Sequence, residues 1–269
     1  SFESPAYANF LAVVTPFCLA AFYTKKPAYG VFLVLIVATQ VYFTDSRTAL
    51  ILFTLEVFIF VLLSYVILKS SAAAKVFLIS AFLMVLLFVL DLANDLSGLS
   101  WVVDKMLSIG LQDSNSFHHV SNLGRWGSQV ASLNIFSENP FFGTGLGQQG
   151  FYAVRAFPTW SLLSWQVRNW LNPQLEIWPP AFSIYTRMLA EVGVLGTICF
   201  LLIFISSMIK LFRLSKEANR SDLKILFLTL FQSWISVFML FFQFGSFRLY
   251  FFWVLLSLTF AADKYAEKV

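Results

Sequence analysis

Long apolar runs separated by short charged connectors dominate the hydrophobic pattern of this 269-residue chain. The runs approach the roughly 20 residues that a helix needs to cross a bilayer. They predict spans at residues 7–23, 28–44, 48–68, 76–90, 225–244 and 247–262, and a further helix that starts after Pro179 and Pro180 and continues past Lys210. The expected fold is therefore all-α, a polytopic integral membrane helical bundle with about seven transmembrane helices.

One long stretch without a span divides the chain into three expected domains. Residues 1–93 would form a first group of about four transmembrane helices. Residues 94–180 would form a large, partly helical loop, and residues 181–269 a second group of about three helices with a cytoplasmic C-terminus. The loop holds six of the eight tryptophans and both histidines, so we expect the chemistry there.

A helical repeat inside the loop predicts an amphipathic helix. Leu123, Trp126, Val130, Leu133 and Phe136 recur every three or four residues, which places them on one face. That face either lies on the outer membrane surface or packs in a protein core, and the sequence leaves both open.

Composition agrees with a membrane protein. The chain is 59% hydrophobic and 12% charged, against roughly 45–50% and about 25% in soluble proteins. The net charge of +4 is small, and we expect no nucleic-acid partner. The two histidines and two cysteines show no metal-ligand spacing, so neither a metal nor a cofactor is expected.

Lysines and arginines are distributed differently around the spans. Nine of the ten lysines fall on one side, which the positive-inside rule makes cytoplasmic. The opposite side would lie outside the cytoplasm and keeps six of the eight arginines, a bias that favours forked binding of phosphate or carboxylate. Solvated arginines, or arginines paired with loop acids, are the alternative. The six are Arg47, Arg125, Arg155, Arg168, Arg187 and Arg248.

A glycine cluster at residues 143–150 formally contains G-x-G-x-x-G at Gly145, Gly147 and Gly150. A dinucleotide site needs a βαβ unit, which the helical pattern excludes here. We interpret the cluster as a turn and an extended loop, whose backbone either approaches a ligand or simply reverses the chain.

Other loop residues have two readings as well. The tryptophans of residues 160–178 form either an interfacial aromatic belt or flat apolar surfaces for sugar rings. Asp45, Ser46 and Arg47 lie at the edge of a span and are either functional or an ordinary polar turn. His118 and His119 are expected to be plain loop histidines.

Four segments, taken in order, resemble the O-antigen ligase and polymerase family of bacterial membrane glycosyltransferases. They are YANFLAVVTP at residues 7–16, DSRTALI at residues 45–51, GRWGSQVASLNIFSENPFFGTGLGQ at residues 124–148 and FSIYTRMLAEVGVLG at residues 182–196. Members usually have more spans, so the resemblance implies that this chain is the C-terminal portion. The family's ligases usually carry a His-Asn pair where this chain has Phe182 and Ser183. That difference favours a repeat-unit polymerase.

The resemblance implies an enzyme of the bacterial inner membrane with its large loop in the periplasm. It would polymerise oligosaccharide repeat units carried on undecaprenyl pyrophosphate, as in O-antigen and lipopolysaccharide biosynthesis, without a metal. Its partners would be these lipid-linked oligosaccharides, the lipid bilayer and a chain-length regulator. An O-antigen ligase, or a flippase or other transporter, is the alternative.

The predicted site follows from the arginines and the resemblance together. Arginines can stabilise the departing pyrophosphate, and a carboxylate can deprotonate the acceptor hydroxyl. The predicted catalytic residues are Arg47, Arg125, Arg187, Glu176 and Glu191; the predicted substrate-binding residues are Arg248, Arg155, Trp126, Gly145 and Gly147.

Overall fold

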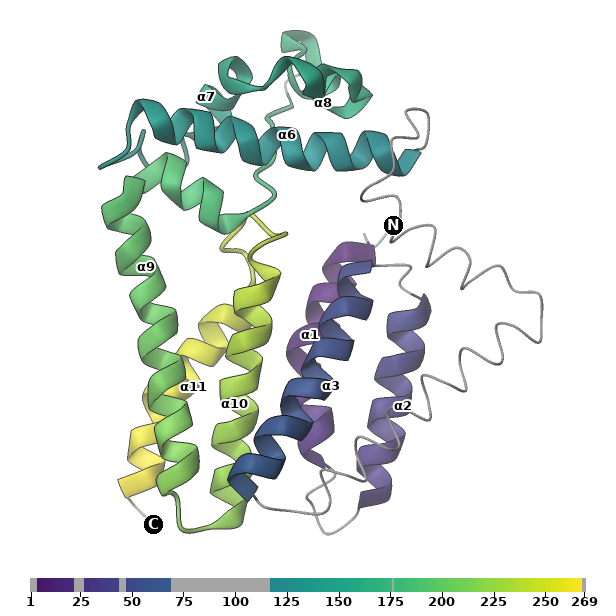
Figure 1. The fold of residues 1–269 in the computed structure, drawn as a ribbon, viewed down its shortest axis with the longest axis vertical. Helices are drawn as coiled ribbons and strands as arrows, with labels where there is room; N and C mark the ends of the chain where they lie inside the picture. Colours follow the sequence, from purple (N-terminus) through teal and green to yellow (C-terminus); the bar gives the residue numbers. More distant parts are fainter. Residues whose placement is uncertain (1–3, 22–26, 44–46, 69–116, 176, 268–269) are drawn as a thin grey trace, which may run out of the picture. The chain divides into compact units, whose positions relative to one another are not determined.

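The computed structural model describes residues 4–21, 27–43, 47–68, 117–175 and 177–267, and every regular element in this part is helical (Figure 1). The chain forms two compact units. The first unit takes Ser1–Val102, Phe204–Met239 and Tyr250–Val269, and the second takes Val103–Ile203 and Leu240–Leu249. We describe each unit by itself.

Three N-terminal helices pack together in the first unit. They are α1 (Ser4–Ala20), α2 (Pro27–Phe43) and α3 (Arg47–Leu68), which lie side by side in Figure 1. Leu19 and Phe60 are fully buried in their shared core. These helices confirm a helical structure at the first three predicted spans.

Helix α10 (Ser221–Leu240) joins several helices of the first unit through polar side chains. Gln232 donates to the backbone carbonyl of Glu56 on α3, and Ser233 donates to the carbonyl of Val13 on α1 at 3.4 Å. The indole N–H of Trp234 donates to the Thr259 hydroxyl on α11 (Tyr250–Glu267) at 2.8 Å. Because a fully buried polar group needs a partner, these contacts fix the register of α10 within the unit.

Two helices are long and apolar enough to cross a membrane by length and composition, α9 (Ile184–Glu217) and α10. In α1, α2, α3 and α11 the apolar parts are shorter, namely Phe10–Ala20, Tyr29–Val41, Ile51–Ile67 and Tyr250–Ala262. The predicted span at residues 76–90 lies outside the described residues. The expected total of about seven spans therefore stays a prediction.

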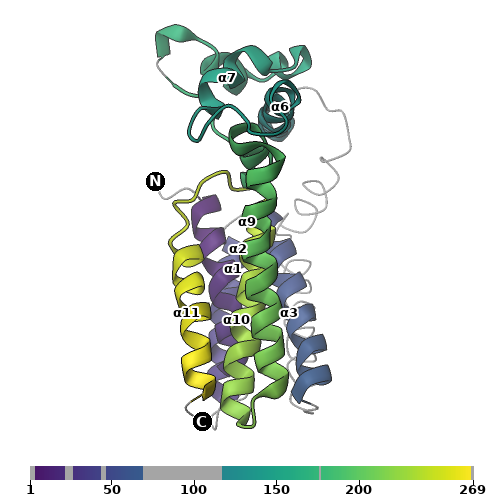
Figure 2. The same ribbon diagram turned by 90° about the vertical axis from the view of Figure 1, so that its left-hand side faces the viewer.

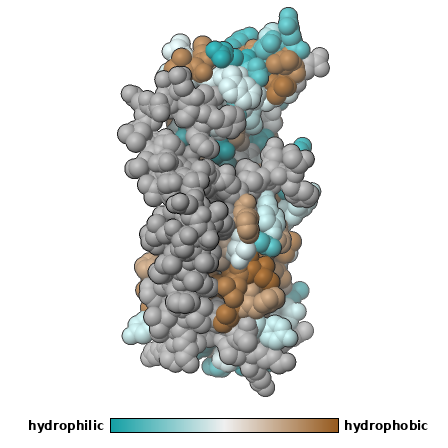
Figure 3. Space-filling view, turned by 90° about the vertical axis from the view of Figure 1, so that its right-hand side faces the viewer, coloured by the Kyte–Doolittle hydropathy of each residue, from teal (hydrophilic) through white to brown (hydrophobic). Residues whose placement is uncertain are grey.

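Many large apolar side chains lie at the surface. Figure 3 shows hydrophobic side chains, in brown, open to the outside on one face. On α9, Leu202 and Ile209 are 54% and 63% exposed, which water would not favour. Such a surface is suited to lipid.

Helix α10 ends earlier than the sequence predicts. The predicted span ran to residue 244, whereas the helix stops at Leu240 and a turn follows. The carbonyl of Phe241 instead accepts hydrogen bonds from the backbone N–H of Ile184 at 3.0 Å and from the Ser183 hydroxyl at 3.2 Å. The start of α9 thus uses an acceptor that a longer α10 would have kept.

The second unit is built on α6 (Phe117–Glu138), seen nearly end-on in Figure 2. Packed on it are α7 (Gln149–Ala156), the 3-10 helix η2 (Thr159–Leu163) and α8 (Trp165–Trp170). A further 3-10 turn, η3 (Pro173–Leu175), follows α8 and precedes α9.

The face of α6 that packs is made mainly of small residues, with Ile135 as a large apolar member. Its buried positions include Gly124, Gly127, Ser128 and Ala131. A Cβ on Gly127 would lie 2.6 Å from the Cβ of Ser161, so the glycine allows η2 to approach closely. Trp126 and Leu133 of the predicted apolar stripe are instead 59% and 43% exposed. The predicted helix is confirmed, and Leu123, Val130 and Phe136 of the stripe are half-buried, so the stripe packs in part.

Candidate functional site

Helix α9 is kinked at Gly193, within the second unit. Gly193 has φ 65° and ψ −169°, which is not helical, so the helix runs from Ile184 to the kink and starts again after it. In an unbroken helix the N–H of Val194 would donate to the carbonyl of Ala190. Here Val194 donates to the carbonyl of Pro140 at 2.8 Å.

The loop of residues 143–150, called the glycine loop below, donates hydrogen bonds to the carbonyl groups that the kink leaves without a helical partner. The N–H of Thr144 donates to the Ala190 carbonyl at 2.9 Å, and the N–H of Gly145 donates to the Glu191 carbonyl at 2.8 Å. The loop and the kink therefore satisfy each other's backbone groups. The glycine cluster thus forms a turn, as one of the two interpretations of the sequence had it. The sequence did not reveal that this turn bonds to α9.

Two glycines allow this close contact between backbones. Gly143 and Gly193 both have positive φ, 68° and 65°. A Cβ on Gly143 would strike the backbone of Glu191, and a Cβ on Gly193 would strike the backbone of Phe141. Only glycine meets both demands at either position.

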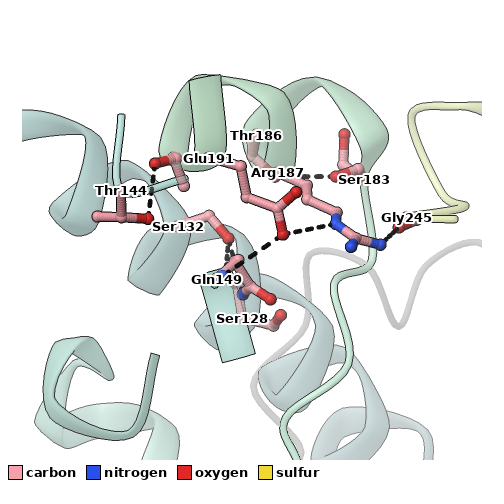
Figure 4. Close-up of polar contacts among 10 residues, drawn as sticks. Ser128, Ser132, Thr144, Gln149, Ser183, Thr186, Arg187, Glu191 and Gly245 are labelled. Atoms are coloured by element: carbon pink, nitrogen blue, oxygen red, sulfur yellow. Dashed lines mark hydrogen bonds and ion pairs between the residues drawn. The ribbon is translucent and has the colours of Figure 1, made fainter. Parts of the chain in front are cut away.

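An ion pair lies on the first turns of α9, next to this contact (Figure 4). The Nε of Arg187 donates to Oε1 of Glu191 at 2.9 Å, and its Nη1 donates to the carbonyl of Gly245 at 2.8 Å. The Glu191 side chain is 2% exposed and that of Arg187 is 27% exposed. The carboxylate is thus enclosed, while the guanidinium reaches the surface.

The Glu191 carboxylate also links α9 to α7. Its Oε1 accepts from the backbone N–H of Gln149 at 3.4 Å, at the N-terminus of α7. A negative charge at a helix N-terminus is favourable. The Gln149 side chain continues the network to the Ser132 hydroxyl at 3.2 Å (Figure 4).

Serine 128 connects α6 to the segment before α9. Its hydroxyl donates to the carbonyl of Pro180 at 2.6 Å. The first turns of α9 are therefore held by α6, α7, the glycine loop and the turn after α10, all within the second unit. Arg187 is fixed by its surroundings before any ligand arrives.

A second feature of the same unit is an open cavity of about 340 Å³. The guanidinium of Arg125 lies 5.8 Å from the ring centre of Phe182, a cation–π distance. Partial burial lowers the pKa of this guanidinium, although an arginine stays protonated in proteins. The lining residues are Ser121, Arg125, Trp165, Gln166, Asn169, Trp170, Ile177 and Phe182.

The structure brings some of the predicted site residues together. Arg187 contacts Glu191 directly, and the backbone of Gly145 contacts the backbone of Glu191. Arg125 lines the cavity, and Trp126 beside it is exposed.

The remaining predicted site residues take no part in the contacts described above. Arg155 is exposed in the last turn of α7, and Arg248 is exposed, with its backbone N–H donating to the Ser246 hydroxyl. A Cβ on Gly147 would meet nothing within 4 Å. Arg47 is the first residue of α3 in the other unit, and Glu176 lies outside the described residues.

Several residues of the network were not predicted. Ser128, Ser132 and Gln149 are small or neutral polar residues on helices, and nothing in their local pattern marks them as buried partners. Gly193 had one visible signal, since a glycine inside an apolar helical run lowers helix stability by about 1 kcal/mol.

The described part is thus all-helical, with apolar helices suited to a membrane and a compact unit that carries a fixed arginine. The family model described as O-antigen ligase matches residues 30–201, which is more than half of the chain. The chain belongs to the O-antigen ligase family, whose members are membrane proteins that act on lipid-linked glycans as ligases or polymerases. Neither the curated proteins nor the solved structures include a match.

Proposed function

We propose that this protein is a membrane glycosyltransferase that polymerises oligosaccharide repeat units carried on undecaprenyl pyrophosphate at the periplasmic face of the inner membrane. The observation that carries the proposal is the fixed, partly exposed guanidinium of Arg187. Family membership supports the glycan substrate and the membrane setting.

Arg187 is suited to bind an anion that forms during a reaction. Its Nε and Nη1 are held by Glu191 and Gly245, and among the described residues its Nη2 has no partner. Donors that are oriented in advance stabilise developing charge at no further cost in ordering. We assign these free N–H groups to the departing lipid pyrophosphate.

In the proposed reaction, the oxygen of an acceptor hydroxyl bonds to the anomeric carbon of the donor sugar. The bond between that carbon and the pyrophosphate oxygen breaks, and the hydroxyl proton passes to a base. Glu191 is buried and bound by Arg187 and Gln149, so we assign it to positioning Arg187. Glu176 remains the predicted base, and Arg47 remains a predicted second cation.

Phe182 favours a polymerase over a ligase. The ligases that this chain resembles usually carry a histidine at the aligned position, and here an apolar ring stands beside Arg125, with its centre 5.8 Å from that of the Trp170 ring. This ring cannot exchange a proton. A ligase that transfers finished glycan to a lipid or protein acceptor is the second candidate, supported by the description of the matching family.

The ladder of glycan chain lengths in a deletion strain tests the proposal. Complementation with the unchanged gene should restore long polymer, and Arg187→Ala and Arg187→Lys should leave single-unit product because lysine lacks the fork. Arg168→Ala is the control, since Arg168 is an exposed arginine of the same unit. Normal long polymer from Arg187→Ala at equal membrane abundance would refute the role of Arg187. A deletion strain without even single-unit product would favour the ligase.

A further inference from the structure

The cavity beside Arg125 has a chemical character that differs from a pyrophosphate site. Its walls include two indole rings, Trp165 and Trp170, with Ile177 and Phe182. The Trp170 ring lies 6.4 Å from Phe157 and 5.8 Å from Phe182, so neighbouring rings hold it in place. These walls offer apolar faces and little charge.

The polar groups of the cavity come from single turns of two helices. Trp165, Gln166, Asn169 and Trp170 are spaced so that one side of α8 faces the cavity. Ser121 and Arg125 are four residues apart on α6 and lie on one side for the same reason. Arg168 lies between Gln166 and Asn169 in the sequence of α8, but it does not line the cavity.

These polar side chains are free to bind a ligand. Within the described residues, the amides of Gln166 and Asn169 have no side-chain hydrogen bond, and no carboxylate pairs with Arg125. Two amides supply both donors and acceptors, and a guanidinium supplies only donors. A phosphate would gain nothing from the amide carbonyl oxygens or the indole rings, whereas a sugar uses all of these groups.

We propose that this cavity binds one sugar ring of the repeat-unit glycan. The C–H face of the ring would lie on Trp165 or Trp170, and its hydroxyl groups would bond to Arg125, Gln166 and Asn169. The volume of about 340 Å³ is in the usual range for small-molecule sites. The inference rests on the proposed function for the identity of the glycan, and it moves Arg125 from the departing pyrophosphate to sugar recognition.

Binding of free oligosaccharide to the full chain in lipid nanodiscs tests the inference. The probe is the repeat unit released from its lipid by mild acid, measured by calorimetry. Arg125→Ala and Asn169→Ala should each weaken binding by about tenfold, the effect of losing a hydrogen bond to a sugar hydroxyl. Arg168→Ala and Gln174→Ala, exposed positions outside the cavity, should bind as the unchanged protein does.

Inorganic pyrophosphate separates the two roles of Arg125. It should not displace the oligosaccharide, and Arg187→Ala should bind the oligosaccharide normally. No binding by the unchanged protein, equal binding by Asn169→Ala, or displacement by pyrophosphate would each overturn the sugar site. If cavity variants lose binding while Arg187→Ala still forms long polymer, the sugar site stands and the proposed role of Arg187 fails.

Discussion

Gly143 and Gly193 show how single residues set the geometry of the second unit. Each has a positive φ, and each lies where a Cβ would enter the backbone of the opposite segment. The contact therefore depends on the absence of side chains, and no rearrangement of neighbouring side chains can relieve a substitution there.

Alanine substitutions separate this close contact from the plain effect of a positive φ. Gly147→Ala should lower stability by about 1–2 kcal/mol, because Gly147 has φ 79° but open space around it. Gly143→Ala should cost more than about 3 kcal/mol, because the methyl group also meets the Glu191 backbone. Thermal unfolding of the two purified variants in detergent measures the difference. Equal loss from both would mean that the loop does not contact α9.

At the scale of elements, α10 organises the first unit through buried polar side chains. Trp234 is fully buried, and its indole packs against Phe204 of α9 and Phe252 of α11, with ring centres 5.0 and 5.6 Å apart. Its N–H also reaches Thr259. The helix thus combines aromatic packing with a specific hydrogen bond.

A double-mutant cycle measures the hydrogen bond within this packing. Trp234→Phe and Thr259→Val should each destabilise the protein by about 1 kcal/mol from the lost bond, and Trp234→Phe should cost more because it also removes buried volume. The double variant should lose less than the sum of the two, by about 1 kcal/mol. Unfolding midpoints in detergent provide the values. Strict additivity would show that the two side chains do not interact.

The sequence predicted the elements better than their faces and ends. Helical structure was expected at the first three spans and at the amphipathic helix of the loop, because those patterns are local. The predicted end of α10 was wrong because the Phe241 carbonyl accepts hydrogen bonds from Ser183 and Ile184, almost 60 positions away in the sequence. The packing face of α6 was predicted only in part, because hydrophobic periodicity also detects the exposed Trp126 and Leu133, whereas close helix packing selects Gly124 and Gly127.

The candidate site was predictable only in part for the same reason. The excess of arginine outside the lysine-rich side pointed to Arg125 and Arg187, since charge bias is visible in a sequence. Arg187 and Glu191 are four residues apart, a spacing that predicts an ion pair on one side of a helix. The bonds from Gly245 and Gln149 join segments that are distant in sequence, and no local pattern encodes them.

At the scale of the whole molecule, orientation in the membrane is the main expectation. The part of α9 after the kink, residues 194–217, has 24 residues and so a length of about 36 Å, which is enough to cross the roughly 30 Å hydrocarbon core. Its last turn and the connector to α10 carry Lys216 and Arg220, which the positive-inside rule puts in the cytoplasm. Residues 137–139, just before the loop of residues 143–150, are expected on the opposite side.

Cysteine labelling tests this orientation. In a chain freed of Cys18 and Cys199, Ser137→Cys should react with a membrane-impermeant maleimide in spheroplasts, and Ala218→Cys should react only after lysis. Both sites are outside the predicted spans, and Ser137 is exposed. Labelling of both from the same side would contradict a crossing by α9.

The exchange of hydrogen bonds at Gly193 limits how this protein can vary in length. Pro140, Thr144 and Gly145 each bond to a fixed residue of α9, so an added or deleted residue among them would shift every later bond out of register. Leu146 and Gly147 make no bond to α9; they are the middle residues of a turn that the Gln148 N–H closes on the Gly145 carbonyl at 3.2 Å, so added residues would only enlarge that turn. We therefore expect homologues to keep a constant number of residues between Pro140 and Gly145. Their insertions should fall just after Gly145, ahead of α7.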